Sequence, residues 1–281
     1  VKDTYQPTKD RLRVTELIGP PLIKALTMKH YDKLEEDCSD RLWSLLGTAV
    51  HYILGNTDSD GVENELSMSK DIPLPPDLAK KWGKDTITIS GTADRVDLKN
   101  GIIEDYKVVG LWSFSQGLKP EWEQQLNVYR WLAESTHDTE IKSMQINAIL
   151  RDWMKGKVND YREPDYPEIA FKVVDVPVWD KERTKEFLSQ RVKAHILGQG
   201  VECTPEERWQ RETTYALHKK GQKKAVRVLP SPEEMQDYID YKGLGGALEK
   251  GQVYVVKRDG KRVRCEGYCL VKKFCPFYKG D

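Results

Sequence analysis

Apolar side chains recur at helical spacing between residues 39 and 55, which predicts an amphipathic helix. Its apolar stripe consists of Leu42, Leu45, Leu46, Ala49 and Ile53. At about 100° of rotation per residue, His51 falls on nearly the opposite side of this helix, beside Ser44 and Gly47. We therefore expect the stripe to face the core and His51 to face solvent or a cleft, where Gly47 leaves room for a ligand.

Further segments indicate a mixture of helices and strands. Helices are expected at 121–135 and 180–197, and strands rich in Ile, Val and Phe at 143–150 and 168–178. The N-terminal part is expected to hold a short helical segment over 11–30 that is broken at Gly19, Pro20 and Pro21. Three prolines predict a loop over 71–84, namely Pro73, Pro75 and Pro76.

Residues 91–107 predict two strands joined by a tight turn, because Asn100-Gly101 suits a two-residue hairpin loop. With that loop, Asp94 lies opposite Lys107 and diagonal to Asp105. Alternate side chains of a strand share a face, so these three side chains point the same way. Diagonal neighbours lie about 7–8 Å apart, within reach of one bound ion.

Two carboxylates and a lysine on one face suit metal-assisted cleavage of a phosphodiester. Hard divalent cations such as Mg²⁺ prefer carboxylate and water oxygens, and they lower the pKa of a bound water. Lys107 would orient that water or stabilise developing negative charge. From these residues alone, the alternative is a surface hairpin with exposed cross-strand pairs. Asp97 and Glu104 are expected to be bystanders, since they fall on the opposite face.

Composition narrows the class of protein. The chain has 281 residues with 45 Lys and Arg against 45 Asp and Glu, so any contact with nucleic acid must come from local patches. Charged residues make up 32% and aromatic residues 9%, which is typical of a globular protein. No apolar run of membrane-spanning length and no apolar signal core is present, which favours a cytoplasmic protein without a membrane segment. In that compartment, five cysteines favour metal ligands or free thiols over disulfides.

Four short motifs follow one another along about residues 10–135. They are Gly47-Thr-Ala-Val-His51, Gly91-Thr-Ala-Asp94-Arg-Val-Asp97, Glu104-Asp105-Tyr106-Lys107 and Gln125-Leu-Asn-Val-Tyr129. In this order the chain resembles the RecB-like branch of the PD-(D/E)XK nucleases, which includes the RecB and AddB nuclease domains and the CRISPR adaptation exonucleases. Each motif is weak alone, whereas the four in one order make a specific match.

The resemblance implies a role for each matching residue. The ligands of a Mg²⁺ or Mn²⁺ ion would be His51, Asp94, Asp105 and the backbone carbonyl of Tyr106. Lys107 would position the attacking water. Gln125 and Tyr129, which are neighbours on one helix face, would support the site at its edge and contact the DNA backbone. The alternative for Gln125 and Tyr129 is ordinary packing.

Three cysteines lie close together near the end of the chain, at Cys265, Cys269 and Cys275. Clustered thiolates bind soft metals, and Cys203 is the first choice for a fourth ligand, with Cys38 second. The RecB-like branch often carries a [4Fe-4S] cluster held by one distant and three clustered cysteines, the last followed by proline, as in Cys275-Pro276. Zinc and free thiols stay open as alternatives, because the first clustered spacing is one residue longer than usual and no early cysteine lies near Gly19.

Local basic patches lie in the second part of the chain. Residues 250–281 hold nine Lys or Arg against three Asp or Glu, and a second cluster consists of Lys219, Lys220, Lys223, Lys224 and Arg227. Such patches suit a phosphate backbone, with aromatic side chains to stack on bases: Tyr268, Phe274, Phe277 and Tyr278. The alternative is a solvated lysine-rich tail whose aromatic side chains are buried around a metal site.

Together these features predict an α/β protein with a restriction-endonuclease-like core, in which helices flank a central mixed sheet. The nuclease core with its N-terminal helical region is expected over 1–198, and a cysteine-bearing C-terminal tail that binds metal and packs on the core over 199–281. The expected function is metal-dependent DNA hydrolysis by an exonuclease that acts on ends or single strands in recombination, repair or phage DNA processing. No helicase motif is present, so a helicase or recombinase is an expected partner. The alternatives are a structure-specific endonuclease and a non-catalytic DNA-binding scaffold.

Overall fold

The computed structural model describes residues 8–35, 37–39, 41–56, 60–160 and 165–279. The protein has an α/β fold with a central mixed sheet and flanking helices. The chain divides into two compact units, Val1–Val201 and Glu202–Asp281, which are described separately below. The predicted boundary follows Gly198. No helix in the described ranges combines the length and the apolar character needed to cross a bilayer.

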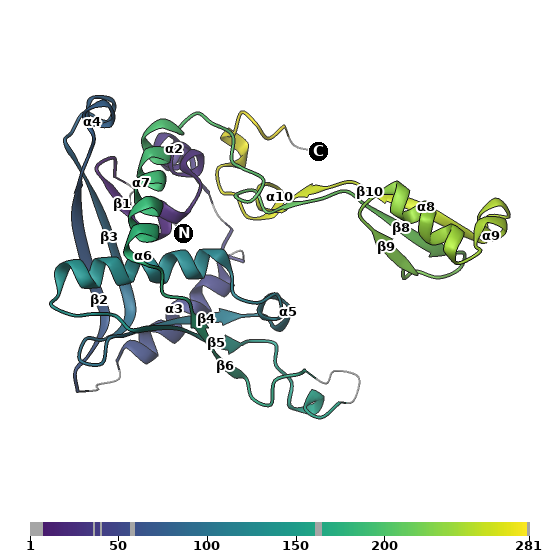
Figure 1. Ribbon diagram of the computed structural model, residues 1–281, viewed down its shortest axis with the longest axis horizontal. Coiled ribbons are helices and arrows are strands. Elements are labelled where there is room, and N and C mark those ends of the chain that lie inside the picture. Colours follow the sequence, from purple (N-terminus) through teal and green to yellow (C-terminus); the bar gives the residue numbers. More distant parts are fainter. Residues whose placement is uncertain (1–7, 36, 40, 57–59, 161–164, 280–281) are drawn as a thin grey trace. The chain divides into compact units, whose positions relative to one another are not determined.

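The central sheet of the first unit has six strands (Figure 1). Along its main path they are β1 (Arg11–Arg13), β3 (Thr86–Asp97), β4 (Ile102–Val109), β5 (Ser143–Leu150) and β6 (Phe171–Val176), and β2 (Val62–Pro73) pairs with β3 as well. The pairs β1–β3 and β4–β5 are parallel, and the other three pairs are antiparallel. The sheet is therefore mixed, as predicted.

Helices pack against this sheet and against one another. The longest are α6 (Pro120–Thr136) and α7 (Lys181–Leu197), and shorter ones are α1 (Val14–Ile18), α2 (Pro21–His30), α3 (Leu42–Gly55), α4 (Pro76–Trp82), α5 (Leu111–Ser115), η1 (Tyr31–Lys33) and η2 (Lys155–Lys157). Helix α6 lies against four strands, β2, β3, β4 and β6, and buries Leu126 and Leu132 completely. Helix α7 packs on α1, α2, α4 and α6.

Local sequence signals explain where these helices begin. Pro120 is the first residue of α6, where its missing amide proton costs nothing, and Glu121 and Glu123 follow in the first turn, where negative charge is favourable. The Asp180 side chain accepts a hydrogen bond of 2.7 Å from the Arg183 amide and so caps α7. The helices predicted at 121–135 and 180–197 and the strand at 143–150 are confirmed, and β6 lies inside the predicted 168–178.

Two predictions for the N-terminal half are wrong. The segment 71–84 is not a loop, because β2 runs to Pro73 and Pro76 begins helix α4. Proline suits the first position of a helix as well as a loop, so its presence alone misleads. The break at Gly19–Pro21 does separate α1 from α2, but Arg11–Arg13 forms a short strand that the helical pattern hides.

The predicted hairpin forms with a different register. Its pairs are Arg95 with Glu104, Val96 with Ile103 and Asp97 with Ile102, so the loop has four residues, 98–101, in place of two. Asp97 is responsible, because its carboxylate accepts hydrogen bonds from the backbone amide and the side-chain amide of Asn100 at 2.8 and 2.7 Å. The prediction that Asp97 is a bystander thus overlooks its role in the turn.

The new register keeps every side chain of the hairpin on its predicted face. A slip of two residues preserves the alternation of a strand, whereas a slip of one would reverse it. Continued by one step, the observed register sets Asp94 opposite Asp105, where the predicted register set it diagonally. Glu104 lies on the other face, where it forms an ion pair with Arg95 and accepts a hydrogen bond from Asn147.

Helix α3 forms close to its predicted bounds, but its predicted core stripe is wrong. Leu42, Leu45 and Ile53 are 58%, 66% and 67% exposed, and no residue of α3 is buried. The helix lies against β3 and β4 with the side that carries His51. Periodicity shows that a helix has two unlike faces, but it does not show which of them meets the sheet.

The second unit has its own sheet and core. Strands β8 (Thr214–Lys219), β9 (Arg227–Leu229) and β10 (Val253–Arg258) form an antiparallel sheet in the order β10–β8–β9. Helices α8 (Pro232–Tyr241) and α9 (Gly245–Glu249) pack on it, and its core consists of Leu217, Met235, Ile239 and Val253. The remaining elements are β7 (Gln210–Arg211), β11 (Lys261–Arg262), α10 (Val263–Gly267) and η3 (Lys272–Phe274).

Candidate metal site and its surroundings

The site lies where β3 changes its partner. Residues 88–90 of β3 pair with β1, whereas residues 95–97 pair with β4 along the same strand. Between these two stretches lies Asp94, whose Oδ2 accepts a hydrogen bond of 2.8 Å from the Tyr106 amide. Asp94 therefore sits at a divergence of strands, where side chains of other elements can reach it.

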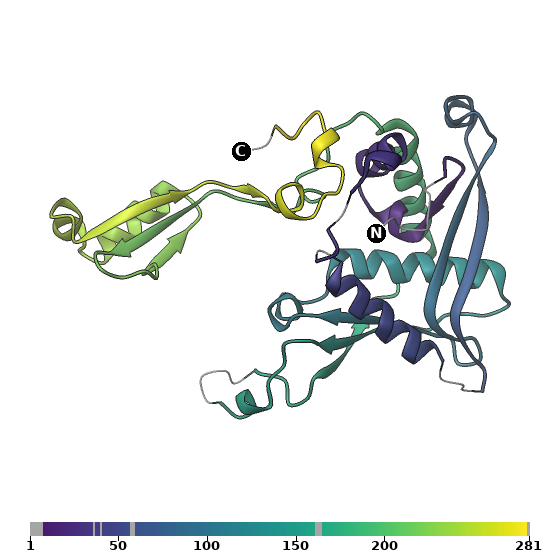
Figure 2. The same cartoon turned by 180° about the vertical axis from the view of Figure 1, so that it is seen from behind.

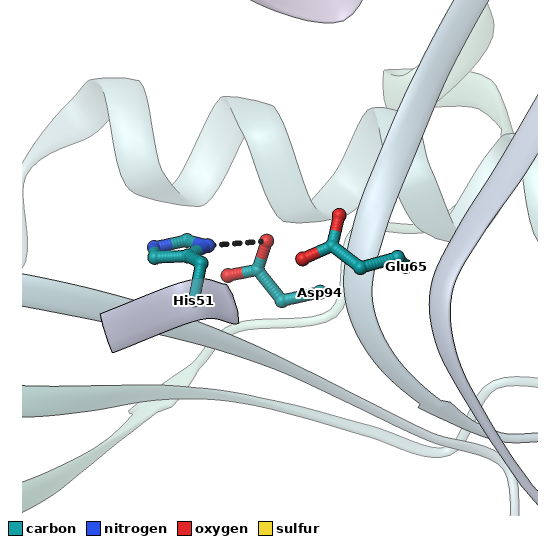
Figure 3. A group of neighbouring side chains, drawn as sticks. All are labelled: His51, Glu65 and Asp94. Carbon is teal, nitrogen blue, oxygen red and sulfur yellow. Dashed lines mark ion pairs between the residues drawn. The ribbon is translucent and has the colours of Figure 1, made fainter. Parts of the chain in front are cut away.

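His51 reaches Asp94 from helix α3. Its Nδ1 lies 3.2 Å from Oδ1 of Asp94, and its Nε2 lies 3.0 Å from the carbonyl oxygen of Tyr106 (Figure 3 shows the contact with Asp94). The hydrogen bond to Asp94 raises the pKa of His51, more than burial of the ring lowers it. Three of the four groups that the sequence assigned to one ion are thus neighbours, and each nitrogen of His51 contacts one of the other two.

Glu65 joins this group, although the sequence analysis missed it. One ligand atom each from His51, Glu65 and Asp94 lie within 4.8 Å of one another (Figure 3). The β2–β3 ladder pairs Asn64 with Arg95 and Leu66 with Ala93 and passes over Glu65, whose φ is 51°. No motif marks this residue, because it is the pairing of β2 with β3, in the same register on both sides of Glu65, that sets it opposite Asp94.

Asp105 is the buried carboxylate of the site, with 1% of its surface exposed. Burial and the neighbouring Asp94 raise its pKa to about 6, against the opposing effect of Lys107. Nζ of Lys107 lies 2.6 Å from Oδ2, yet within the described ranges neither oxygen of Asp105 accepts a hydrogen bond of acceptable geometry. A divalent cation would complete such a carboxylate, so the residues fit the metal that the sequence implies.

Lys107 is connected to helix α6 by two side chains. Its Nζ donates to Oε1 of Gln125 at 3.3 Å, and Nε2 of Gln125 donates to the hydroxyl of Tyr129 at 3.1 Å. Tyr129 is only 5% exposed and belongs to the hydrophobic core. Gly91 makes room for its ring, because a Cβ atom there would lie 2.5 Å from Cε1 of Tyr129. Tyr129 thus packs in the core, and the partly buried Gln125 connects it to Lys107 at the site.

A cavity of about 560 Å³ opens beside His51 and Glu65. Its walls come mainly from one face of α3, and they include Ser44, Gly47, Thr48 and Tyr52. Nothing lies within 4 Å of the position where a Cβ atom of Gly47 would be. The predicted cleft next to His51 and Gly47 is therefore present, and it offers space for a ligand beside His51 and the carboxylate of Glu65.

The four cysteines of the second unit are partly buried, whereas Cys38 in the first unit is exposed. The pKa of Cys203 rises to about 12, chiefly from burial, with smaller contributions from Glu207 and from the thiols of Cys265, Cys275 and Cys269. The four thiols thus lie within electrostatic reach of one another. Among the residues that the structure describes, however, no three cysteine Sγ atoms lie within 4.8 Å of one another.

Comparison with known proteins gives only distant structural similarity. No family model and no curated protein matches the chain. The crystal structure of a protein named SSO0001 is similar, with 17% identity, a TM-score of 0.46 and coverage of 73% of this chain and 84% of that one. A phage related exonuclease from Haemophilus somnus 129PT is also similar, with 15% identity, a TM-score of 0.38 and coverage of 68% of this chain and 92% of that one. Both TM-scores lie below 0.5, so the chemistry of the site is judged by its own geometry.

Proposed function

We propose that the chain is a Mg²⁺- or Mn²⁺-dependent DNA nuclease. The observation that carries this proposal is the convergence of His51, Glu65 and Asp94, with ligand atoms within 4.8 Å, beside the buried carboxylate of Asp105. Oxygen-rich sites with one imidazole suit hard or borderline divalent cations. A lysine next to such a site is useful where negative charge develops on a phosphate.

Each side chain has a proposed task in phosphodiester hydrolysis. Asp94, Asp105, His51 and the Tyr106 carbonyl would hold the cation, and Glu65 would be a further ligand or would orient a bound water. When bound, the cation polarises the phosphate and supplies a water of lowered pKa. Lys107 holds the water or the developing negative charge at its Nζ. Gln125 fixes Lys107, since it accepts the hydrogen bond from that Nζ.

The test is cleavage of end-labelled linear DNA in the presence of Mn²⁺. The intact chain should cut, and Asp105→Ala should lose activity by about 10³-fold or more, since one ligand and one fixed charge disappear. Asp175→Ala is the matched control, because Asp175 is an exposed strand carboxylate in β6, outside the site, and should leave the rate unchanged. Equal activity of the intact chain and Asp105→Ala would refute the assignment.

We propose that the activity is exonucleolytic, on ends or single strands, in recombination, repair or phage DNA processing. A circular single-stranded substrate separates this proposal from the structure-specific endonuclease, because only an endonuclease cuts a molecule without ends. If the intact chain binds DNA but never cuts it, the scaffold alternative holds. The chain has no nucleotide-binding loop motif, so a helicase or recombinase is the proposed partner for processive work.

For the second unit we propose a [4Fe-4S] cluster on Cys203, Cys265, Cys269 and Cys275. The proposal rests on the sequence, in which one distant cysteine precedes three clustered ones and proline follows the last, and zinc remains the alternative. Brown protein with broad visible absorption after anaerobic purification is expected, whereas colourless protein with stoichiometric zinc would refute the cluster.

A further inference from the structure

The sheet of the second unit has one covered and one open face. The ladder pairs Leu217 with Val255 and His218 with Tyr254, so side chains at alternate positions belong to opposite faces. Leu217 and Val253 belong to the face that packs on helix α8, with Met235 and Ile239 (Figures 1 and 2). Alternation assigns Thr214, Ala216, His218, Val228, Tyr254, Val256 and Arg258 to the open face, although Ala216, on the central strand, is fully buried.

A ring stack and a guanidinium dominate the open face. The rings of His218 and Tyr254 stack at 5.5 Å between centroids with 13° between their planes. Nη2 of Arg258 lies 3.3 Å from Nε2 of His218, so the three side chains are neighbours on this face. Tyr254 remains 44% exposed, and its neighbour Val256 38%. The group therefore offers accessible π surface and a positive charge at the same place.

Charge is divided between the two sides of this sheet. None of the seven open-face positions on the described strands carries an acidic side chain, whereas α8 on the covered side carries Glu233, Glu234, Asp237 and Asp240. Beyond the end of β8, exposed lysines follow at Lys220, Lys223 and Lys224. The 80 residues from 202 to 281 hold 17 Lys and Arg against 12 Asp and Glu. The open face thus presents a basic side chain and no acidic one on its described strands, whereas the acidic side chains of α8 repel a polyanion.

We propose that this open face binds single-stranded DNA, with bases stacked on Tyr254 and His218 and phosphates near Arg258 and the lysines after β8. Stacking on an aromatic ring needs a base that is free on one side, which single strands provide and duplexes do not. The choice of DNA as the strand rests on the proposed function. Binding at this face is a function distinct from that of the metal site, because it requires neither a cation nor cleavage.

The test measures binding of the full chain to a fluorescent oligo-dT strand by anisotropy in EDTA, where no cleavage takes place. Tyr254→Ala should weaken binding about fivefold to a hundredfold, as loss of a base stack does, whereas Tyr254→Phe should keep it. Tyr241→Ala is the matched control, because Tyr241 on α8 is 81% exposed and away from the open face. Arg258→Ala should weaken binding and flatten its salt dependence, but Lys257→Ala, on the covered side of β10, should not.

A second measurement localises the contact independently of affinity. Amide exchange in residues 253–258 should slow when oligo-dT is added, and circular dichroism should show the variants folded. Unchanged affinity in Tyr254→Ala, or unchanged exchange in β10, would overturn the proposal. Preferred binding of RNA or duplex would overturn the choice of strand, and loss of self-association in Tyr254→Ala without loss of binding would make the face a dimer contact. Because binding is measured without a cation, a failure to bind would not refute the proposed cleavage, and a failure to cleave would not refute the proposed binding.

Discussion

Glu65 shows how the backbone of a single residue serves the site. Its φ of 51° is a left-handed conformation that costs a residue with a Cβ atom about 1–2 kcal/mol. Burial and the charge of Asp94 also raise the pKa of its carboxyl group, so the position carries an electrostatic cost as well. Both costs are tolerable where the carboxylate has a task, and both disappear together in a glycine variant.

Glu65→Gly is expected to stabilise the metal-free protein by about 1 kcal/mol, because glycine adopts positive φ freely. The same variant should bind Mn²⁺ more weakly, since a carboxylate of the site is lost. Thermal unfolding in EDTA and calorimetric titration with Mn²⁺ measure the two effects. Glu63→Gly, at an exposed position with ordinary ladder pairing two residues earlier, should instead lose about 0.5–1 kcal/mol. A destabilised Glu65→Gly would show that this backbone conformation carries no strain.

Tyr129→Phe removes the hydroxyl that accepts the hydrogen bond from Gln125. Gln125, the hydrogen-bond partner of Lys107, is then no longer held by Tyr129. The single-turnover cleavage rate should therefore fall about tenfold, equivalent to about 1.4 kcal/mol. Affinity for Mn²⁺ should be unchanged, because no ligand of the cation is altered. Single-turnover cleavage at saturating Mn²⁺, next to a Mn²⁺ titration, separates the two quantities. An unchanged rate would mean that Tyr129 only packs.

At the scale of elements, local signals predicted what the chain forms, and long-range packing decided how the elements meet. The alternation of side chains along a strand was enough to place Asp94, Asp105 and Lys107 on one face, because a register shift of two residues leaves each side chain on the same face. The register itself depended on the side chain of Asp97, whose hydrogen bonds to Asn100 enlarge the loop. The position of His51 on the polar side of α3 could be predicted. The contact of that side with the sheet could not, and neither could the backbone distortion of β2 at Glu65, because both depend on residues far away in sequence.

Helix α7 is tied to α1 by a buried histidine, which gives stability a pH dependence. His195 is 3% exposed, its Nε2 contacts the carbonyl of Leu17 at 3.1 Å, and burial, with help from Arg191 and Lys24, lowers its pKa from 6.5 to about 4. The unfolded chain therefore binds a proton that the folded one rejects between these pH values. The contribution is complete above pH 6.5 and is lost as pH falls towards 4, by roughly 3 kcal/mol in total.

His195→Gln keeps a donor near Leu17 but cannot titrate. Urea unfolding at several pH values should show a flatter dependence between pH 4 and 6.5 for this variant than for the parent chain. Identical slopes for both proteins would show that His195 titrates normally.

At the scale of the whole molecule, the net charge of zero is the sum of opposite net charges on the two units. The second unit carries an excess of five positive charges, and the first unit the matching excess of negative ones, including the carboxylates of the site. Each unit also has its own hydrophobic core. Charge and packing therefore allow the two units to be perturbed one at a time.

Ile239→Ala is expected to unfold the second unit alone. Ile239 is 1% exposed in a small core, and its truncation costs about 2–5 kcal/mol, comparable to all that a unit of 80 residues can supply. Hydrogen exchange read by mass spectrometry should show loss of protection in β8 and β10, with β4 and β5 unaffected. Ile239→Val, at about 0.5–1.5 kcal/mol, is the milder control. Simultaneous loss of protection in β4 and β5 would show that the units unfold as one.

The outward stripe of α3 has a thermodynamic consequence. Because Leu45 and Ile53 remain 66% and 67% exposed, this helix gains little cohesion from the hydrophobic effect. Part of what fastens it to the sheet is the pair of contacts made by His51, a side chain that the proposed cation would share. Binding of the cation and ordering of α3 are then linked, because each stabilises the other by the same free energy. Slower amide exchange along α3 would therefore report tighter binding of the ion.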